Sequence, residues 1–334
     1  MYSYWRRALM AGAALAIAGF VGGLPDQAVG SDREAEGCTG WLPDFGCKAK
    51  GVYSGFSRPM SMPYLFEHPF ITTDLQAAGI WQELPEDSVF EGGYINIAAL
   101  QIRVALTDRL GFIAVRDGYA WFKPDLALVS HDSGFADMSF GFKYALIDRP
   151  DEGIIVSPHL RFEPDFGDHD LFQGMGDGIV IPGVSFGWRM ADDLHMLGAV
   201  GAQLPLDGGK NSTYVHYNLH LDYALTPSVS PFVEVGGIHW TSDGDGSTTV
   251  HLENGGRLTL SEVQSALGTG RFEGYDFANL GSEDVAGNDM ITGMVGVRVQ
   301  WTDDLSVGIA YERPLTQRND LMKQRVTLMA SYEF

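Results

Sequence analysis

Apolar and polar side chains alternate along most of the chain, in segments of about ten residues. In one such segment Leu100, Ile102 and Val104 share a face, opposite Gln101 and Arg103. A period of two is typical of a β-strand with one apolar and one polar face. The pattern predicts strands near residues 70–82, 93–106, 110–122, 134–146, 153–165, 178–190, 194–205, 213–225, 229–240, 290–301, 305–313 and 324–334.

The connections between these strands alternate in length. Short polar turns, such as Thr107-Asp108-Arg109, join one end of the strands. Longer connections rich in Gly and Asp join the other end, and the longest covers residues 241–289. This asymmetry is typical of an up-and-down antiparallel meander with one end in the periplasm and the other outside the cell.

The polar faces of the strands carry charges of both signs, whereas the opposite faces are aliphatic and aromatic. A soluble β-sandwich, the alternative architecture, would keep charges out of its interior. A membrane barrel inverts that rule, because its apolar face meets lipid and its polar face lines the lumen. The sequence therefore predicts an all-β fold, a transmembrane up-and-down antiparallel β-barrel of about twelve strands over residues 70–334. The lumen-lining candidates are Arg103, Arg116, Asp137, Lys143, His159, Arg161, Glu163, Arg189, His216, His220, Asp222, Glu234, Arg298, Glu312 and Arg325.

Two interpretations of this charged lumen stay open. In the first, the charges pair with one another and partly fill the barrel, because a lone buried charge is costly. In the second, they line a narrow aqueous path and select solutes. His216 and His220 lie about 13 Å apart along an extended strand, too far to share a metal ion. We therefore predict no metal site there.

Residues 1–30 have the features of a secretory signal peptide. Arg6 and Arg7 precede a short apolar stretch, and Ala28 suits the minus-three position of a cleavage site after Gly30. The alternative, an uncleaved membrane anchor, would need a longer and more strongly apolar stretch. Within residues 31–69, Cys38 and Cys47 predict a local disulfide in an exported protein. Two thiolates alone do not complete a zinc site.

The rest of residues 31–69 leaves two placements open, a periplasmic extension or a plug inside the lumen. The net charge of −21 argues against nucleic acid as a partner, since phosphate binding needs clustered Lys and Arg. Because no glycine-rich phosphate loop leads into a helix, nucleotide chemistry is not expected, and we predict no cofactor.

The long loop 241–289 contains two local signals. Thr259 and Glu262 fit a capping box, and glycines follow Leu267, which together predict a short helix. Asp243 and Asp245 could contribute to a calcium site, but the full EF-hand pattern is absent and a solvated turn explains them. The loop could fold inward as a constriction or cover the mouth of the barrel.

His131 and Ser133 are the candidates for an enzyme, because outer-membrane phospholipases carry a similar His-x-Ser pair on a barrel strand. Alternate residues share a strand face, so the geometry is permitted. A nucleophile also needs its base held by a third group, and the sequence nominates none. We therefore predict no catalytic residue.

The chain ends in RVTLMASYEF, an alternating strand with Tyr332 and Phe334 on its apolar face. This ending resembles the C-terminal strand of Gram-negative outer-membrane β-barrel proteins, whose terminal Phe is read by the barrel assembly machinery. The hairpins ALQIRVALTDRLGFIAV and LDYALTPSVSPFVEVG resemble those of outer-membrane transporters named for phenol meta-pathway degradation. This resemblance implies a small-molecule channel for aromatic or apolar compounds, and it assigns no functional residue.

Together these features predict an exported protein of the Gram-negative outer membrane that is in contact with its lipid and passively transports a small solute. Two alternatives stay open: a barrel enzyme acting on lipid, and a closed barrel with a structural or surface-interaction role.

Overall fold

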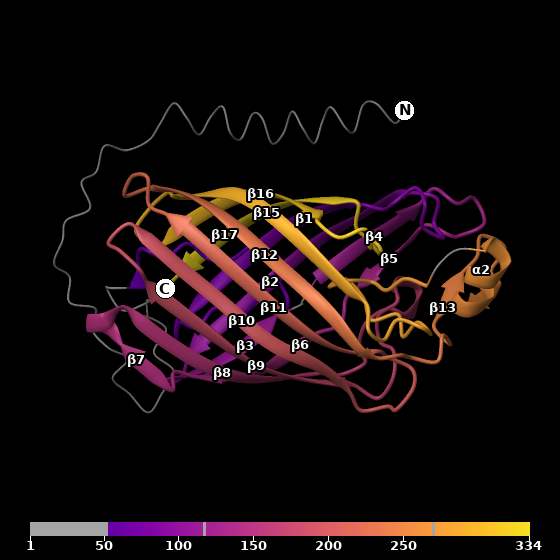
Figure 1. Ribbon diagram of the computed structural model, residues 1–334, viewed down its shortest axis with the longest axis horizontal. Helices are drawn as coiled ribbons and strands as arrows, with labels where there is room; N and C mark the ends of the chain where they lie inside the picture. Colours follow the sequence, from indigo (N-terminus) through magenta and orange to yellow (C-terminus); the bar gives the residue numbers. More distant parts are fainter. Residues whose placement is uncertain (1–52, 116–117, 269–270) are drawn as a thin grey trace. The chain divides into compact units, whose positions relative to one another are not determined.

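The computed structural model describes residues 53–115, 118–268 and 271–334, so residues 1–30, Cys38, Cys47 and Arg116 lie outside it. The described chain forms a closed antiparallel barrel of 12 strands (Figure 1). Its elements in chain order are β1 (Asp74–Glu83), β2 (Gly93–Ala105), β3 (Leu110–Val115), β4 (Gly118–Pro124), β5 (Asp132–Phe135), β6 (Ser139–Tyr144), β7 (Ile147–Arg149), β8 (Ile154–Glu163), β9 (Ile179–Arg189), β10 (Leu194–Pro205), β11 (Thr213–Tyr223), β12 (Val229–Ser242), β15 (Asp289–Gln300), β16 (Leu305–Pro314) and β17 (Gln324–Glu333).

Two of the twelve strands are interrupted. β3 and β4 both pair with β2, and their other neighbours are β6 and β5 respectively, while β6 and β7 both pair with β8. One interrupted strand therefore consists of β3 and β4, and the other of β5, β6 and β7. With this allowance, the predicted all-β barrel and its strand number are confirmed. The predicted strand boundaries agree with the observed ones to within a few residues, although the first strand begins at Asp74 rather than at residue 70.

The barrel closes between its first and last strands. β1 pairs with β2 on one side and with β17 on the other, with Asp74 opposite both Arg103 and Glu333. Closure leaves no strand edge, so every strand of the wall finds neighbours on both sides.

Side chains alternate between the two faces of the wall as the sequence pattern predicts. On β6, Ser139, Gly141 and Lys143 are buried, whereas Phe140 and Phe142 are exposed, the latter by 53%. Leu160 on β8 and Val295 on β15 are exposed by 55% and 58%. A wall that exposes its apolar side chains and buries its charged ones suits lipid outside and a polar interior.

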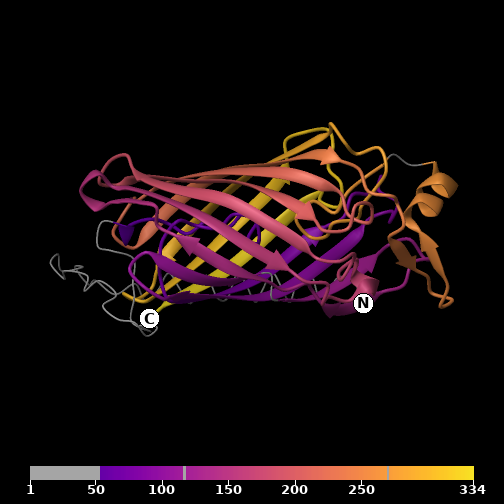
Figure 2. The ribbon, with the colours of Figure 1, turned by 90° about the horizontal axis from the view of Figure 1, so that it is seen from below.

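The two ends of the barrel differ. Figures 1 and 2 both place α2 (Leu260–Leu267) and β13 (Thr249–His251) at the end away from the C-terminus. β13 pairs with β14 (Arg257–Thr259), and both belong to the long loop. The predicted short helix is confirmed: Thr259 and Glu262 form a capping box, and Gly268 ends α2 in a left-handed conformation. None of the described helices has the length and apolar composition of a membrane span.

Residues 53–73, here called the inner segment, lie inside the barrel. Nearly all of their side chains are buried, including Met60, Met62 and Leu65 at 0% exposure. Side chains of two adjacent strands bind the segment: the hydroxyl of Ser157 on β8 donates to Pro69 O, and that of Ser185 on β9 donates to Glu67 O.

We expect Gly141→Ala to destabilise the barrel. A Cβ at Gly141 would lie 2.0 Å from the carbonyl oxygen of Leu160 on the neighbouring strand, and overpacking of this kind costs about 1–3 kcal/mol. Gly79→Ala on β1 is the matched control, because a Cβ there meets nothing within 4 Å. Urea unfolding of refolded protein in lipid measures the difference. Equal stability of the two variants would contradict the close approach of β6 and β8.

Candidate functional site: the barrel interior

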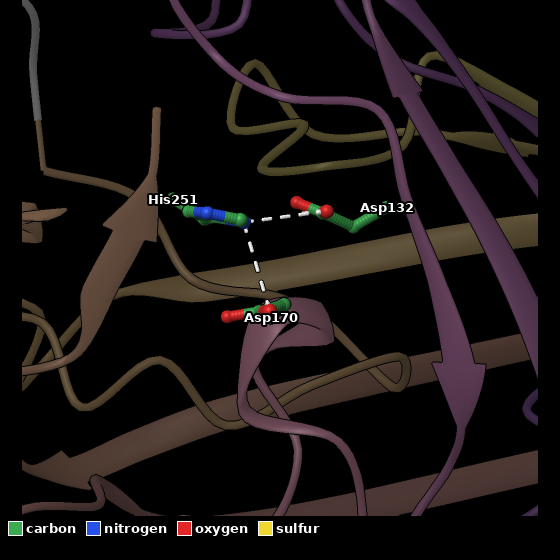
Figure 3. A group of neighbouring side chains, drawn as sticks. All are labelled: Asp132, Asp170 and His251. Atoms are coloured by element: carbon green, nitrogen blue, oxygen red, sulfur yellow. Dashed lines mark hydrogen bonds and ion pairs between the residues drawn. The ribbon is translucent and has the colours of Figure 1, made fainter. Parts of the chain in front are cut away.

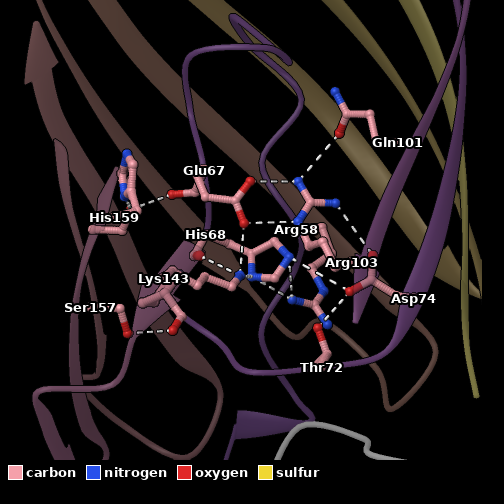
Figure 4. A network of polar contacts seen from close by, with 12 residues as sticks. Arg58, Glu67, His68, Thr72, Asp74, Gln101, Arg103, Lys143, Ser157 and His159 are labelled. Carbon is pink, nitrogen blue, oxygen red and sulfur yellow. Dashed lines mark hydrogen bonds and ion pairs between the residues drawn. The ribbon is translucent and has the colours of Figure 1, made fainter. Parts of the chain in front are cut away.

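The inner segment carries a carboxylate that two cations of the wall share. Glu67 Oε2 lies 2.7 Å from Nη2 of Arg103 on β2, and Glu67 Oε1 lies 2.7 Å from Nζ of Lys143 on β6 (Figure 4). All three side chains are at most 2% exposed. Asp74 adds a second carboxylate, 3.3 Å from Nη1 of Arg103. These contacts bind the inner segment to the wall through charge-assisted hydrogen bonds.

A second polar chain runs across β10, β11 and β12. His195 Nδ1 lies 2.9 Å from Asp222, whose other carboxylate oxygen lies 3.2 Å from His220 Nε2. The remaining ring nitrogen of His220 lies 2.9 Å from Glu234 Oε1. All four groups are buried, so the chain satisfies polar atoms that would be costly to leave alone.

The inner segment also binds this second chain. The backbone N–H groups of Met60 and Ser61 donate to the two oxygens of Glu234, at 2.9 and 2.7 Å. The N–H of Ser57 donates to Asp222 at 3.3 Å. The segment has no regular secondary structure over these residues. Side chains of the wall therefore accept the backbone hydrogen bonds that a neighbouring strand would accept in a sheet.

Arginines from two further strands cap carbonyl groups of the inner segment. Arg161 on β8 donates to Tyr64 O and lies over the Tyr64 ring, 5.4 Å from its centroid. Arg298 on β15 donates to Arg58 O at 3.1 Å. The strands that bind the inner segment therefore include β2, β6, β8, β9, β11, β12 and β15, on several sides of the barrel.

Residues 271–285 of the long loop, here called the inward loop, enter the barrel from the opposite end. Asp276 forms an ion pair with Arg325 on β17, and Arg325 Nη1 also lies 3.3 Å from Glu312 on β16. The hydroxyls of Tyr275 and Thr292 lie 2.8 Å apart, and Thr292 donates to Glu312 at 2.7 Å. The loop is thus held by buried, inward-facing groups of three adjacent strands.

Glu273 holds the inward loop in its folded shape. Its carboxylate oxygens accept from the backbone N–H groups of Leu280 and Ser282, at 2.9 and 2.8 Å. Burial raises the pKa of Glu273 to about 7, and the nearby charge of Asp320 acts in the same direction. Burial likewise raises the pKa of Asp320 to about 6.

An apolar cavity of about 50 Å³ lies between the inner segment and the inward loop. Pro63 and Tyr64 of the inner segment line it, as do Asp276 and Phe277 of the inward loop. The wall contributes mainly small and aliphatic side chains, with two polar ones: Ala78, Ile80, Ile97, Ala99, Gln101, Gly118, Ala136 and Arg325. The cavity is thus mainly apolar, with the charged pair Asp276 and Arg325 at its border.

The remaining lumen-lining candidates are less uniform. His159 is buried with Nδ1 3.4 Å from Ser185 Oγ, and His216 is fully buried with no hydrogen-bond partner on either ring nitrogen. Glu163 is buried on β8. Asp137 is also buried, but it accepts from backbone N–H groups of a loop, including that of Gly174. Arg189 differs, because its side chain is 33% exposed beside Asp192.

Sequence alternation did not identify the residues that reach the interior from outside the regular strands. Glu67, His68, Glu273, Tyr275 and Asp276 are all buried there. They lie in irregular segments, where no period indicates which side chain turns inward. The sequence signal was the position of their segments, an N-terminal stretch before the first strand and an unusually long loop.

The two residues considered for an enzyme do not bind each other among the described residues. Nε2 of His131 lies 3.3 Å from the carbonyl oxygen of Pro124, and Ser133 Oγ lies 3.0 Å from the hydroxyl of Tyr119. Tyr332 and Phe334, the residues of the predicted assembly signal, are 42% and 43% exposed on the outer face, with ring centroids 5.1 Å apart.

The fold and its exposed apolar wall define an outer-membrane β-barrel. Residues 79–270, more than half of the chain, match the family described as "Putative MetA-pathway of phenol degradation", and the chain belongs to that family. This confirms the resemblance noted in its hairpins. No curated protein matches the chain by sequence.

Similar solved structures include one channel and two porins. The COG4313 outer membrane channel from Pseudomonas putida F1 is 11% identical, with a TM-score of 0.52 over 84% of this chain and 100% of that one. The NanC porin is 9% identical, with a TM-score of 0.48 over 78% of this chain and 100% of that chain. The KdgM porin is 11% identical, with a TM-score of 0.44 over 78% and 99%.

We expect Glu67→Gln to destabilise the folded barrel by about 3 kcal/mol or more, because it leaves buried Arg103 and Lys143 without their shared carboxylate. Glu152→Gln is the matched control. Its partner Arg149 lies 3.3 Å away, but both side chains are more than half exposed, so the loss is expected to stay below about 1 kcal/mol. Urea unfolding measures both, and equal losses would contradict the role of Glu67.

We expect the stability contributed by Glu273 to fall as the pH rises. The pKa of Glu273 is about 7 in the folded loop against an ordinary 4.5, so the folded state holds a proton that the unfolded chain releases. Its contribution is therefore full below pH 4.5 and decreases by as much as about 3 kcal/mol as the pH passes 7.

The difference in the free energy of unfolding between wild type and Glu273→Gln, measured by urea titration across this range, isolates the effect because Gln does not titrate. A difference that does not change with pH would contradict the raised pKa.

Proposed function

We propose that the protein is a passive channel of the outer membrane for a small solute, with aromatic or apolar compounds as the preferred class. The observation that carries the proposal is the apolar cavity inside the barrel, between the inner segment and the inward loop. The channel and porin folds of similar solved structures are consistent with this proposal.

The cavity also indicates how passage would be controlled. At about 50 Å³ it is smaller than the roughly 150 Å³ cavity that binds benzene in an engineered protein core. An aromatic solute therefore passes only when a lining segment moves. The inward loop is the better candidate, because it belongs to a long connection, whereas the inner segment is bound by at least seven strands.

A lipid hydrolase finds less support in this arrangement. The chemistry would need the Ser133 hydroxyl within hydrogen-bond reach of a base. Both His131 and Ser133 have other partners among the described residues.

We expect Ala78→Trp to reduce the uptake of a small aromatic solute to the rate of protein-free vesicles, because the indole would fill the cavity. Ala77→Trp is the matched control: it adds the same side chain at the adjacent position, on the exposed face of β1. Uptake is measured in proteoliposomes that contain equal amounts of folded barrel.

Two results would contradict the proposal. If solute uptake is no faster with wild-type protein than without protein, the protein is not a channel for that solute. Equal uptake by the two Trp variants would show that solutes do not pass through the cavity.

A further inference from the structure

We propose that Asp132, Asp170 and His251 form a binding site for a divalent transition-metal ion such as Zn²⁺ at the end of the barrel that carries the long loop. The three residues come from separate parts of the chain: the start of β5, the short 3₁₀ helix η3 (His169–Leu171) and the end of β13. Figure 3 shows their polar groups converging on one point. The proposal does not depend on which solute the barrel transports.

The distances fit metal ligands better than hydrogen bonds. His251 Nδ1 lies 3.3 Å from Asp132 Oδ1 and 3.6 Å from Asp170 Oδ2, and one atom from each residue lies within 4.8 Å of the others. A charge-assisted hydrogen bond would be about 2.7–2.9 Å long, and one ring N–H cannot serve two acceptors well. Ligands of a tetrahedral zinc ion are about 3.4 Å apart, given bonds of about 2.0–2.2 Å.

Neighbouring groups orient the two carboxylates. The hydroxyl of Ser130 donates to Asp132 Oδ2, and Arg257 donates to Asp170 Oδ1, so in each case the other oxygen is directed at His251. Such outer contacts commonly fix the orientation of metal ligands. The positive charge of Arg257, whose side chain is 45% exposed, works against a cation and sets a limit on affinity.

The donor set selects the class of metal. One imidazole nitrogen and two carboxylate oxygens suit Zn²⁺ and related transition metals, whereas Ca²⁺ and Mg²⁺ prefer oxygen ligands alone. The three ligand side chains are between 16% and 29% exposed, so an ion can reach them and a solvent molecule can complete the tetrahedron.

Binding would reinforce connections that already touch, since the N–H of Ser130 donates to His251 O at 3.0 Å and Arg257 pairs with Asp170. The loop before η3 follows β8, and β13 belongs to the same long loop as the inward loop. An ion shared by Asp132, Asp170 and His251 would tie this long loop to β5 and to η3. The proposed site is therefore a metal-dependent latch on the loops at this end of the barrel.

The test is a titration of the folded, chelator-stripped full-length barrel with Co²⁺ and Zn²⁺. We expect one Co²⁺ per chain with the visible absorption of a tetrahedral site, displaced by Zn²⁺. Asp132→Asn, Asp170→Asn and His251→Gln should each weaken binding by about tenfold or more.

The matched control is His239→Gln, which removes an imidazole that lies 2.7 Å from Asp289, a pair beside which the described residues supply no third ligand. This variant should bind metal like the wild type. Heat-modifiable gel migration shows whether each variant is folded. If a ligand variant does not fold, the stoichiometry and spectrum of the wild type decide.

Three results would overturn the proposal: no Co²⁺ binding by the wild type, binding that the ligand variants leave unchanged, or displacement of Co²⁺ by Ca²⁺ as readily as by Zn²⁺. The first would show that His251 is only a hydrogen-bonding partner of the two carboxylates.

Discussion

A charged side chain that points into a narrow barrel needs a partner of opposite charge inside it. Without one, the side chain would be buried away from water at a large cost in free energy. The alternation of the strands sends Arg103, Lys143 and Arg325 inward, where water has little room. Two irregular segments supply what the wall lacks: Glu67 from one end and Asp276 from the other. These buried charges therefore form pairs in which the strands supply the cations and the inner segment and the inward loop supply the carboxylates.

The apolar cavity lies between the inner segment and the inward loop. Ala78, Ile97 and Ala99 line it and need no polar partner. The charges at the border of the cavity, Arg325 of the wall and Asp276 of the inward loop, pair with each other. The small size of the cavity follows from the two bulky side chains that bound it, Tyr64 and Phe277.

The barrel could be predicted from the sequence because a membrane wall repeats one physical rule at every second residue. The capping box of α2 was equally predictable, since Thr259 and Glu262 act over three positions. The contacts that the inner segment and the inward loop make with the wall were not predictable. Glu67 lies 36 residues from Arg103 and 76 from Lys143, and its segment has no period to indicate orientation. Such contacts between residues far apart in the sequence depend on the three-dimensional structure of the barrel.

The inner segment leads directly into β1, and β1 pairs with β17. At the same seam the backbone N–H of Phe334 donates to Thr73 O at 3.0 Å, and Arg58 pairs with Glu333. β17 thus contacts both β1 and the inner segment. Docking of the inner segment and pairing of the seam are therefore linked, because the same stretch of β17 takes part in both.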